Sequence, residues 1–315
     1  MVEVYGKKAT RYGFGEGLVA LGEKDPKIFV LGADTAASVA INIFEKKFPE
    51  RFANVGVAEQ NLLGMAAGLA VAGWKPYVAT YSVFATGRPW EMIRTAICYS
   101  NLNVKIGGSH AGVMVGPDGA THQALEDVAI MRVLPKMTVI VPCDVVETKK
   151  ATMASAGIDG PVFIRFGREN IPIHTKEDTP FEVGRAEVFR AGTDVAILAC
   201  GAMVYEALSA AETLEKSGIS ARVVNVHTIK PIDQQTIVAA AKECGAVVTA
   251  EEHQLMGGFG SAVCEVLAQQ CPVPVEMVGI RDTFGESGDA MELLKTYNLK
   301  DTDIVSAAQR ALKRK

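Results

Sequence analysis

Short runs of apolar and β-branched residues alternate with longer amphipathic segments along the chain. Each run is typical of a buried strand, and each intervening segment is typical of a helix that covers a sheet. The runs predict strands near residues 28–34, 76–81, 103–109, 138–142, 161–166, 194–200, 221–227, 246–251 and 273–280. The first helix is predicted to begin after Thr10, which would cap it. This alternation predicts an α/β fold whose sheets are mostly parallel and flanked by helices.

The alternation lapses between residues 169 and 187, where the chain is polar and interrupted by prolines. A stretch of this kind is typical of a linker between two domains. Because the chain has 315 residues, we expect two α/β domains, at about residues 1–175 and 190–315.

One stretch, residues 54–73, is apolar almost throughout and carries a single charge, Glu59. It predicts a helix buried on most of its sides, yet it is too short and too rich in glycine to span a bilayer. An isolated carboxylate in such a place is difficult to ionise, and a carboxyl group that stays protonated can donate its proton. The helix dipole also favours an acid in the first turn, so a purely structural reason for Glu59 stays open.

Composition excludes several classes of protein. The net charge is −4 with both signs interspersed, which gives no electrostatic footprint for nucleic acid or for a membrane surface. The six cysteines form no CxxC pair and lie mostly in apolar settings, so we expect reduced core residues rather than disulfides or metal ligands. The first residues lack the apolar core of a signal peptide. We therefore expect a cytoplasmic protein.

Several polar and aromatic side chains follow predicted strands, and parallel α/β sheets bind ligands beyond the carboxyl ends of their strands. Ser38 follows the first strand, Tyr81 and Phe84 follow the second, and Arg168 follows the strand near residues 161–166. Each has an ordinary explanation when taken alone, as a core aromatic or a surface residue. Their shared placement favours a binding site at this edge.

A glycine-rich loop over residues 110–123 contains His110, Asp118 and His122. The backbone N–H groups of such a loop favour an anion, and the two histidines could bind substrate hydroxyls or phosphate or move protons. Each histidine alone could equally be a loop residue with satisfied hydrogen bonds. A metal site is a poor fit, because no third ligand has a suitable spacing.

Three motifs together resemble the pyrimidine-binding domain of transketolases: GVAEQN with Glu59, YSVF with Tyr81 and Phe84, and GPDGATHQ with Asp118 and His122. The resemblance continues through the C-terminal domain of that family, to the end of the chain. In length and starting point the chain is similar to the C-terminal subunit of split transketolases, which two genes encode. The resemblance implies transfer of a two-carbon ketol unit from a ketose phosphate to an aldose phosphate, with thiamine diphosphate as cofactor, as in the pentose phosphate pathway.

The resemblance also implies roles for individual residues. Glu59 matches the glutamate that hydrogen-bonds the cofactor's aminopyrimidine ring, Phe84 matches the ring stacked on it, and Tyr81 lines the same pocket. Asp118 matches the carboxylate that reads a substrate hydroxyl, and His122 the histidine at the reacting carbons. The residues that match those gripping the sugar phosphate are Arg11, Ser38, His110 and Arg168.

The sequence departs from the family in two places. The family often has another aromatic three residues beyond Phe84, where this chain has Gly87 followed by Arg88. Nothing matches the GDG…N element that holds the cofactor's diphosphate through Mg²⁺. We therefore expect a partner subunit to hold the metal and no metal to bind to this chain. We expect the complex to be a heterotetramer of two plus two chains. The isolated chain is expected to form at most a homodimer.

Three alternatives stay open. A β subunit of a 2-oxo-acid dehydrogenase has a similar size and domain order, although DGATHQ and the phosphate-site residues speak against it. Deoxyxylulose-phosphate synthase shares YS-x-F and a DG-x-THQ loop, but typically lacks a histidine at position 110. A non-catalytic partner subunit would be expected to lose Glu59 or His122, and this chain has both.

Overall fold

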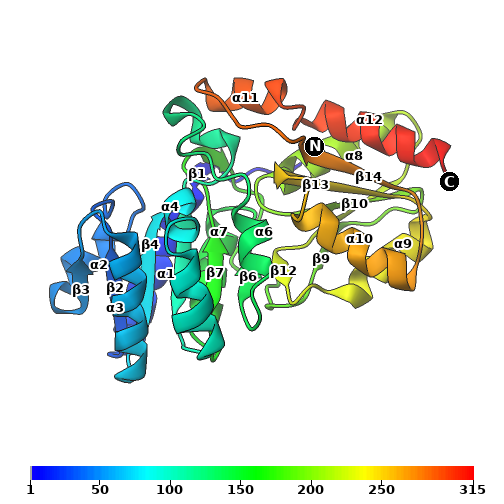
Figure 1. Cartoon of the computed structure of the whole chain (residues 1–315). Helices are drawn as coiled ribbons and strands as arrows, with labels where there is room; N and C mark the ends of the chain where they lie inside the picture. Colours follow the sequence, from blue (N-terminus) through cyan, green and yellow to red (C-terminus); the bar gives the residue numbers. More distant parts are fainter. Residues whose placement is uncertain (1) are drawn as a thin grey trace.

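Two mainly parallel sheets, each flanked by helices, form the framework of the computed structural model, which describes residues 2–315 (Figure 1). The predicted α/β fold is therefore confirmed. A third, two-stranded sheet joins the start of the chain to the segment after the first large sheet. Among the described residues, no helix is both long enough and apolar enough to cross a membrane.

The first large sheet has seven strands in the order β12-β6-β7-β5-β4-β2-β3, all parallel except β12, which runs antiparallel to β6. Its strands are β2 (Ile28–Gly32), β3 (Phe52–Asn54), β4 (Lys75–Tyr81), β5 (Lys105–Ser109), β6 (Thr138–Ile140), β7 (Val162–Arg165) and β12 (Thr228–Lys230). Because β12 comes from the second half of the chain, that half supplies an edge strand to the first sheet. The division at residues 175 and 190 stays a prediction.

The second large sheet has five strands in the order β14-β13-β10-β11-β9, with only β9 antiparallel to its neighbour. Its strands are β9 (Glu187–Arg190), β10 (Val195–Ala199), β11 (Ala221–Asn225), β13 (Val247–Gln254) and β14 (Val275–Ile280). All nine predicted strands are present, with ends that differ by a few residues. The remaining small sheet pairs β1 (Lys7–Ala9) with β8 (Asn170–Pro172).

Helices cover both faces of the sheets (Figure 1). They are α1 (Thr10–Lys24), α2 (Asn42–Lys47), α3 (Glu59–Val71), α4 (Ser82–Thr86), α5 (Trp90–Met92), α6 (Asp127–Arg132), α7 (Val145–Ser155), α8 (Met203–Lys216), α9 (Gln234–Cys244), α10 (Phe259–Gln270), α11 (Ala290–Thr296) and α12 (Asp301–Lys313). Shorter helical turns are η1 (Pro49–Arg51), a π-helix η2 (Ile93–Tyr99) and a 3₁₀ segment η3 (Val113–Asp118).

Neighbouring residues of the central strands point to opposite faces of the first sheet. Leu31 of β2 packs in one apolar cluster with Leu62 of α3, whereas Val30 packs in another with Phe14 of α1. All four side chains are completely buried. Burial of this kind stabilises a fold by roughly 1.5–3 kcal/mol for each large apolar side chain. The buried faces of α1 and α3 thus fix both helices against the strands that carry the site.

The helix α1 begins at Thr10, but the predicted side-chain cap is wrong. The Thr10 hydroxyl accepts a hydrogen bond from the N–H of Gly167 at 2.7 Å and donates one to the Gly167 carbonyl oxygen at 3.3 Å. The hydroxyl is therefore bonded to a distant part of the chain and does not cap α1. As a result, the start of α1 is tied to the segment after β7, which brings Arg11 close to Arg168.

The helix α3 is less enclosed than the sequence predicts. Leu62, Leu63 and Ala66 are buried against the sheet, but Met65 is 40% exposed and Val71 is 75% exposed. One face of α3 covers the sheet, while no part of the described chain covers the other. In this chain alone, the prediction of a helix buried on most sides is therefore wrong.

Candidate active site

Two aromatic rings and two histidines meet at the carboxyl ends of β4 and β5. Tyr81 ends β4 and Phe84 lies in the following helix α4, with ring centroids 6.2 Å apart. His110, directly after β5, stacks on Tyr81 at 4.1 Å, and His122 lies edge-on to Phe84 at 5.3 Å. The parallel strands thus gather four of the predicted site residues into one cluster.

Glu59 is the first residue of α3 and is only 4% exposed. Its carboxylate is not isolated, because Nη1 of Arg88 donates to both carboxylate oxygens, at 3.1 and 3.0 Å. The Arg88 guanidinium also lies over the Phe84 ring, 4.4 Å from its centroid. Glu59 is therefore joined to the aromatic cluster through Arg88.

Sequence reasoning assigned no role to Arg88, although a signal was present. It is the first cation after the Tyr81–Phe84 pair, and a buried acid needs a positive partner. Gly87, which departs from the family pattern, ends α4 in this structure. A Cβ atom at Gly87 would lie 2.7 Å from the Val83 carbonyl oxygen, so this turn excludes a side chain.

Basic residues gather near His110. Nη1 of Arg11 donates to the carbonyl oxygen of Arg168 at 2.8 Å. Nη1 of Arg168 donates to the Val115 carbonyl oxygen at 2.8 Å and to Oδ1 of Asp118 at 3.1 Å. Arg168 therefore connects α1, the segment after β7 and the glycine-rich loop. Two guanidinium groups share this end of the cluster with the carboxylates of Asp118 and Glu169, the latter 3.7 Å from Nε of Arg168.

His110 contributes a neutral ring to the same group. Burial lowers its pKa to about 3, and the nearby charges of Arg11, Arg168 and His122 act in the same direction. One ring nitrogen, Nδ1, is paired with the Ser109 hydroxyl at 2.8 Å. At pH 7 His110 can therefore take part in hydrogen bonds but brings no positive charge, which comes from the two arginines.

Ser38 is the one predicted site residue that the structure does not connect with the others. It lies on an exposed turn between β2 and α2, and its side chain makes no hydrogen bond within residues 2–315. Its role in binding the substrate stays a prediction.

The second half of the chain holds the glycine-rich loop in place. Glu252 of β13 accepts a hydrogen bond from the N–H of Met114 at 2.7 Å. Gly112 has φ = +82°, and a Cβ atom there would lie 2.1 Å from Oε1 of Glu252. Only a glycine fits at this position, because both the backbone conformation and the close carboxylate exclude a side chain.

A buried ion pair connects this region to the aromatic cluster. Nε of Arg165 donates to both oxygens of Asp127, at 3.0 and 2.9 Å, and its Nη2 donates to the Glu252 carbonyl oxygen at 2.9 Å. Asp127 also accepts a 2.6 Å hydrogen bond from Ser82, the residue between Tyr81 and the rest of α4. Sequence reasoning missed this network, whose members come from α4, α6, β7 and β13.

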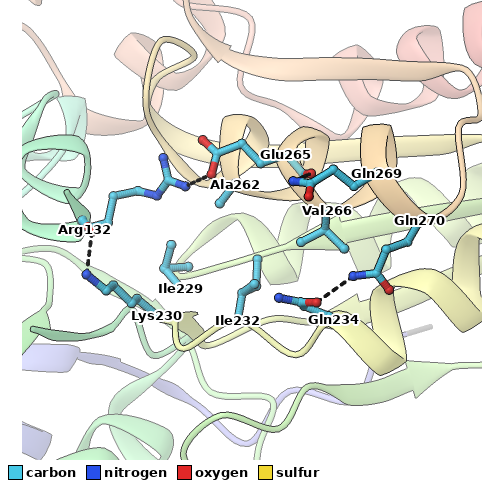
Figure 2. Close-up of a pocket in the computed structure, with 10 residues that line it drawn as sticks. All are labelled: Arg132, Ile229, Lys230, Ile232, Gln234, Ala262, Glu265, Val266, Gln269 and Gln270. Carbon is cyan, nitrogen blue, oxygen red and sulfur yellow. Dashed lines mark hydrogen bonds and ion pairs between the residues drawn. The ribbon is translucent and has the colours of Figure 1, made fainter. Parts of the chain in front are cut away.

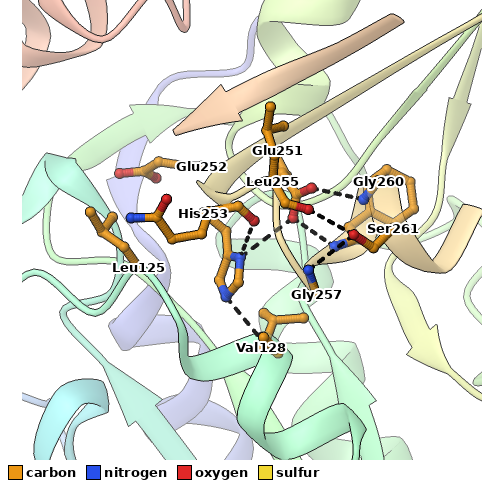
Figure 3. Close-up of polar contacts among 12 residues, drawn as sticks. Leu125, Val128, Glu251, Glu252, His253, Leu255, Gly257, Gly260 and Ser261 are labelled. Carbon is orange, nitrogen blue, oxygen red and sulfur yellow. Dashed lines mark hydrogen bonds and ion pairs between the residues drawn. The ribbon is translucent and has the colours of Figure 1, made fainter. Parts of the chain in front are cut away.

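Figure 3 shows the part of the buried network that lies in β13 and α10. Glu251 accepts hydrogen bonds from the N–H groups of Phe259 and Gly260, at 2.6 and 2.7 Å, and so stabilises the start of α10. Nε2 of His253 accepts one from Ala129 of α6 at 3.3 Å. Burial raises the pKa of Glu251 to about 8 and lowers the pKa of His253 to about 4. These contacts link β13 and α10, from the second half of the chain, to α6 in the first half.

The cleft in Figure 2 is lined by polar groups that are already paired with one another, so it offers no candidate for the chemistry. It has a volume of about 350 Å³ and lies between β12, α9 and α10. Arg132 donates to Glu265 at 2.6 Å, and Lys230 donates to the carbonyl oxygen of Arg132 at 2.9 Å. Gln270 donates to Gln234 at 2.6 Å.

Within the part of the chain that the structure describes, one group of side chains has the spacing of metal ligands: Cys143, Asp144 and His174, whose ligand atoms lie within 4.8 Å of one another. Asp144 caps α7, and its two oxygens accept hydrogen bonds from four backbone N–H groups. The hydrogen bonds of the cap account for this carboxylate without a metal. All six cysteines are free thiols.

The sheet topology defines an α/β protein, and at the ends of its strands an acid, two aromatic rings, two histidines and two arginines lie close together. Residues 6–174 match the transketolase pyrimidine binding domain, and residues 184–304 match the transketolase C-terminal domain. The chain belongs to the transketolase family.

Relatives of nearly the same length are separate chains. A relative from Methanocaldococcus jannaschii, whose name describes it as a transketolase C-terminal section, is 45% identical to this chain. The match covers 98% of this chain and 97% of the relative. The 6-deoxy-6-sulfo-D-fructose transketolase subunit SqwH of Clostridium sp. (strain MSTE9) is 42% identical over 95% of this chain and 92% of its own. The resemblance to the C-terminal subunit of split transketolases is thereby confirmed.

A solved structure agrees with this assignment. It is described as a split gene transketolase, inactive beta4 tetramer, and it is 51% identical to this chain. The two structures superpose with a TM-score of 0.92 over 98% of this chain and 99% of the other. The beta4 assembly of that relative is larger than the homodimer that we expect for this chain in isolation.

Proposed function

We propose that this chain is the C-terminal subunit of a thiamine-diphosphate-dependent transketolase, which moves a two-carbon ketol unit from a ketose phosphate to an aldose phosphate. The observation that carries the proposal is the single cluster in which Phe84 lies beside Tyr81 and His122 and is joined to Glu59 through Arg88. An acid, two flat rings and a histidine at strand ends suit the binding of a heterocycle and the movement of protons next to it.

The residues present fit the pyrimidine half of the cofactor. A planar guanidinium lies on Phe84 and donates to Glu59, so this place accommodates a flat group that carries nitrogen atoms. In the proposed complex Phe84 stacks on the ring, Tyr81 forms the wall, and the Glu59 carboxyl donates to a ring nitrogen. When bound, thiamine diphosphate supplies the nucleophilic carbon for ketol transfer.

The other residues of the cluster bind and orient the sugar. Arg11 and Arg168 attract its terminal anion, and His110 adds a hydrogen bond without charge. Asp118 accepts a hydrogen bond from a substrate hydroxyl, and His122 moves a proton at the reacting carbons. Because Asp118 now pairs with Arg168, an incoming anion must compete with that carboxylate.

The substrate class is a sugar with a terminal oxyanion. The name of the Clostridium relative gives it a sulfonated fructose, and sulfonate and phosphate are both tetrahedral groups of oxygen acceptors. Two arginines suit either group. We propose phosphorylated sugars of the pentose phosphate type for this chain, as in the family at large.

A partner subunit completes the site. The sequence has no GDG…N element, so we propose that the partner binds Mg²⁺ and the diphosphate, since Mg²⁺ prefers carboxylate and carbonyl oxygens beside phosphate groups. The uncharged exposed face of α3, with Met65, Gly68 and Val71, supports a partner seated there. Two-fold pairing gives a heterotetramer of two plus two chains. Free thiols support a cytoplasmic location.

The alternative functions make different use of the same residues. A β subunit of a 2-oxo-acid dehydrogenase has no need of Arg11 and Arg168 near His110. A deoxyxylulose-phosphate synthase typically lacks a histidine at position 110, which here stacks on Tyr81. A non-catalytic subunit has no need of Glu59 and His122 in one cluster.

The test is to mix the purified chain with candidate diphosphate-binding subunits and to measure ketol transfer. Glu59→Gln is expected to fold and to lower turnover by about 10²–10⁴, the usual range for one acid–base group. Circular dichroism and co-purification with the partner serve as controls for folding and assembly. Transfer close to that of the wild type by the assembled variant would exclude the assigned role.

A further inference from the structure

The guanidinium of Arg88 makes both of the contacts that the proposed function assigns to the cofactor's aminopyrimidine. It lies 4.4 Å from the centroid of Phe84, and its Nη1 donates to both oxygens of Glu59. A planar group that stacks on a ring and hydrogen-bonds an acid imitates an aromatic heterocycle. Arg88 and the ring cannot occupy this place together.

We propose that Arg88 is an internal stand-in for the aminopyrimidine ring, and that it must leave Glu59 before the cofactor can bind there. The inference rests on the proposed function of the site, because it takes Glu59 and Phe84 as the cofactor pocket. It adds Arg88 to that pocket and gives it a defined role: its side chain is displaced when the cofactor binds.

Arg88 is the member of the pair that moves. Its side chain is 53% exposed, whereas that of Glu59 is 4% exposed and fixed at the first turn of α3. Apart from Glu59 and Phe84, the Arg88 side chain has no polar or ring contact within residues 2–315. Rotation of the half-exposed Arg88 side chain into solvent therefore opens the space between Glu59 and Phe84 without disturbing a helix.

The displacement frees the acid of the pocket. While Arg88 is in place, both oxygens of Glu59 accept hydrogen bonds from its Nη1. Once the guanidinium has left, the buried carboxyl group has no other side-chain partner in the described part of the chain and is available to a nitrogen-bearing ring stacked on Phe84.

Calorimetry on the complex with the diphosphate-binding subunit and Mg²⁺ tests this exchange. Titration with thiamine diphosphate gives the affinity of the wild type and of Arg88→Met, which keeps an unbranched side chain without the charge.

Arg88→Met is expected to bind the cofactor about 1.5- to 5-fold more tightly, the fold-change that corresponds to one partly exposed ion pair. Arg88→Lys is the matched control, because it keeps the charge and is expected to bind the cofactor with about the affinity of the wild type. Equal affinity in the wild type and Arg88→Met would overturn the inference. Weaker binding by Arg88→Met would also overturn it, since Arg88 would then hold the cofactor.

A second readout needs no variant. In a crystal structure of the wild-type complex with thiamine diphosphate, the Arg88 guanidinium must lie beyond hydrogen-bond distance of Glu59. A guanidinium still on Glu59 beside a bound ring would overturn the inference. Either failure is distinct from failure of the proposed function, which is decided by ketol transfer in the Glu59→Gln complex.

Discussion

The imidazole of His110 stacks on the ring of Tyr81, with the two centroids 4.1 Å apart. Burial and the neighbouring positive charges lower the pKa of His110 to about 3, so the stacked ring is neutral at pH 7. Arg168 lies on the same side of the cluster but keeps its charge and pairs with Asp118. The two residues that resemble phosphate ligands therefore differ in what they offer an anion.

This difference predicts unequal effects on substrate binding. Arg168→Ala is expected to raise the KM for phosphorylated sugars about 10–100-fold, because a charged hydrogen bond contributes roughly 1.5–3 kcal/mol. His110→Ala is expected to raise it only about 2–10-fold, as a neutral hydrogen bond contributes roughly 0.5–1.5 kcal/mol. His110→Phe, which keeps the stacking, serves as the control. Equal losses for phosphorylated and unphosphorylated sugars would mean that neither residue binds the anion.

The low pKa of His110 also predicts a dependence of stability on pH. The unfolded histidine has a pKa near 6.5 and the folded one about 3, so between these values the unfolded chain binds the additional proton. The contribution of neutral His110 is complete above pH 6.5 and is lost as the pH falls toward 3. Relative to His110→Phe, the wild type should lose up to about 1.4 kcal/mol per pH unit.

Urea unfolding of the wild type and His110→Phe at pH 7.5, 6.0 and 5.0 measures this difference. The comparison removes the contributions of other groups, such as Glu251, that titrate equally in both proteins. A difference in unfolding free energy that does not change across these three conditions would contradict a buried neutral histidine.

The buried pair of Arg165 and Asp127 predicts a strong effect on folding. The two side chains are 7% and 0% exposed, so removal of one leaves the other charged and unpaired in the interior. Arg165→Met is expected to lower the unfolding free energy by about 3–5 kcal/mol. The double variant with Asp127→Asn should recover part of this loss. Additive losses in chemical denaturation would show that the two charges are not coupled.

The fold was largely predictable because its central strands are continuous apolar runs between polar segments. The runs near residues 103–109 and 194–200 correspond to β5 and β10. The strands that sequence reasoning missed are β1, β3, β8, β9 and β12, which have three or four residues and lie at edges or in the two-stranded sheet. A run that short shows no periodicity, and its pairing depends on a partner elsewhere in the chain.

The candidate site was predictable where the chemistry follows a strand end. His110 and Tyr81 are neighbours because β4 and β5 are parallel and adjacent. Arg88 and Glu59 are 29 residues apart, and their contact depends on how α3 packs beside the turn after α4. No spacing rule encodes such a pair. The same holds for Ser82 and Asp127, which are 45 residues apart.

The central claim is that this chain supplies only the pyrimidine and sugar half of a cofactor site that a partner completes. Calorimetric titration of the purified chain with thiamine diphosphate and Mg²⁺, without and then with the partner subunit, tests it most directly. The predicted result is little or no binding by the chain alone and one cofactor per site once the partner is present. Tight stoichiometric binding and ketol transfer by the chain alone would contradict the claim.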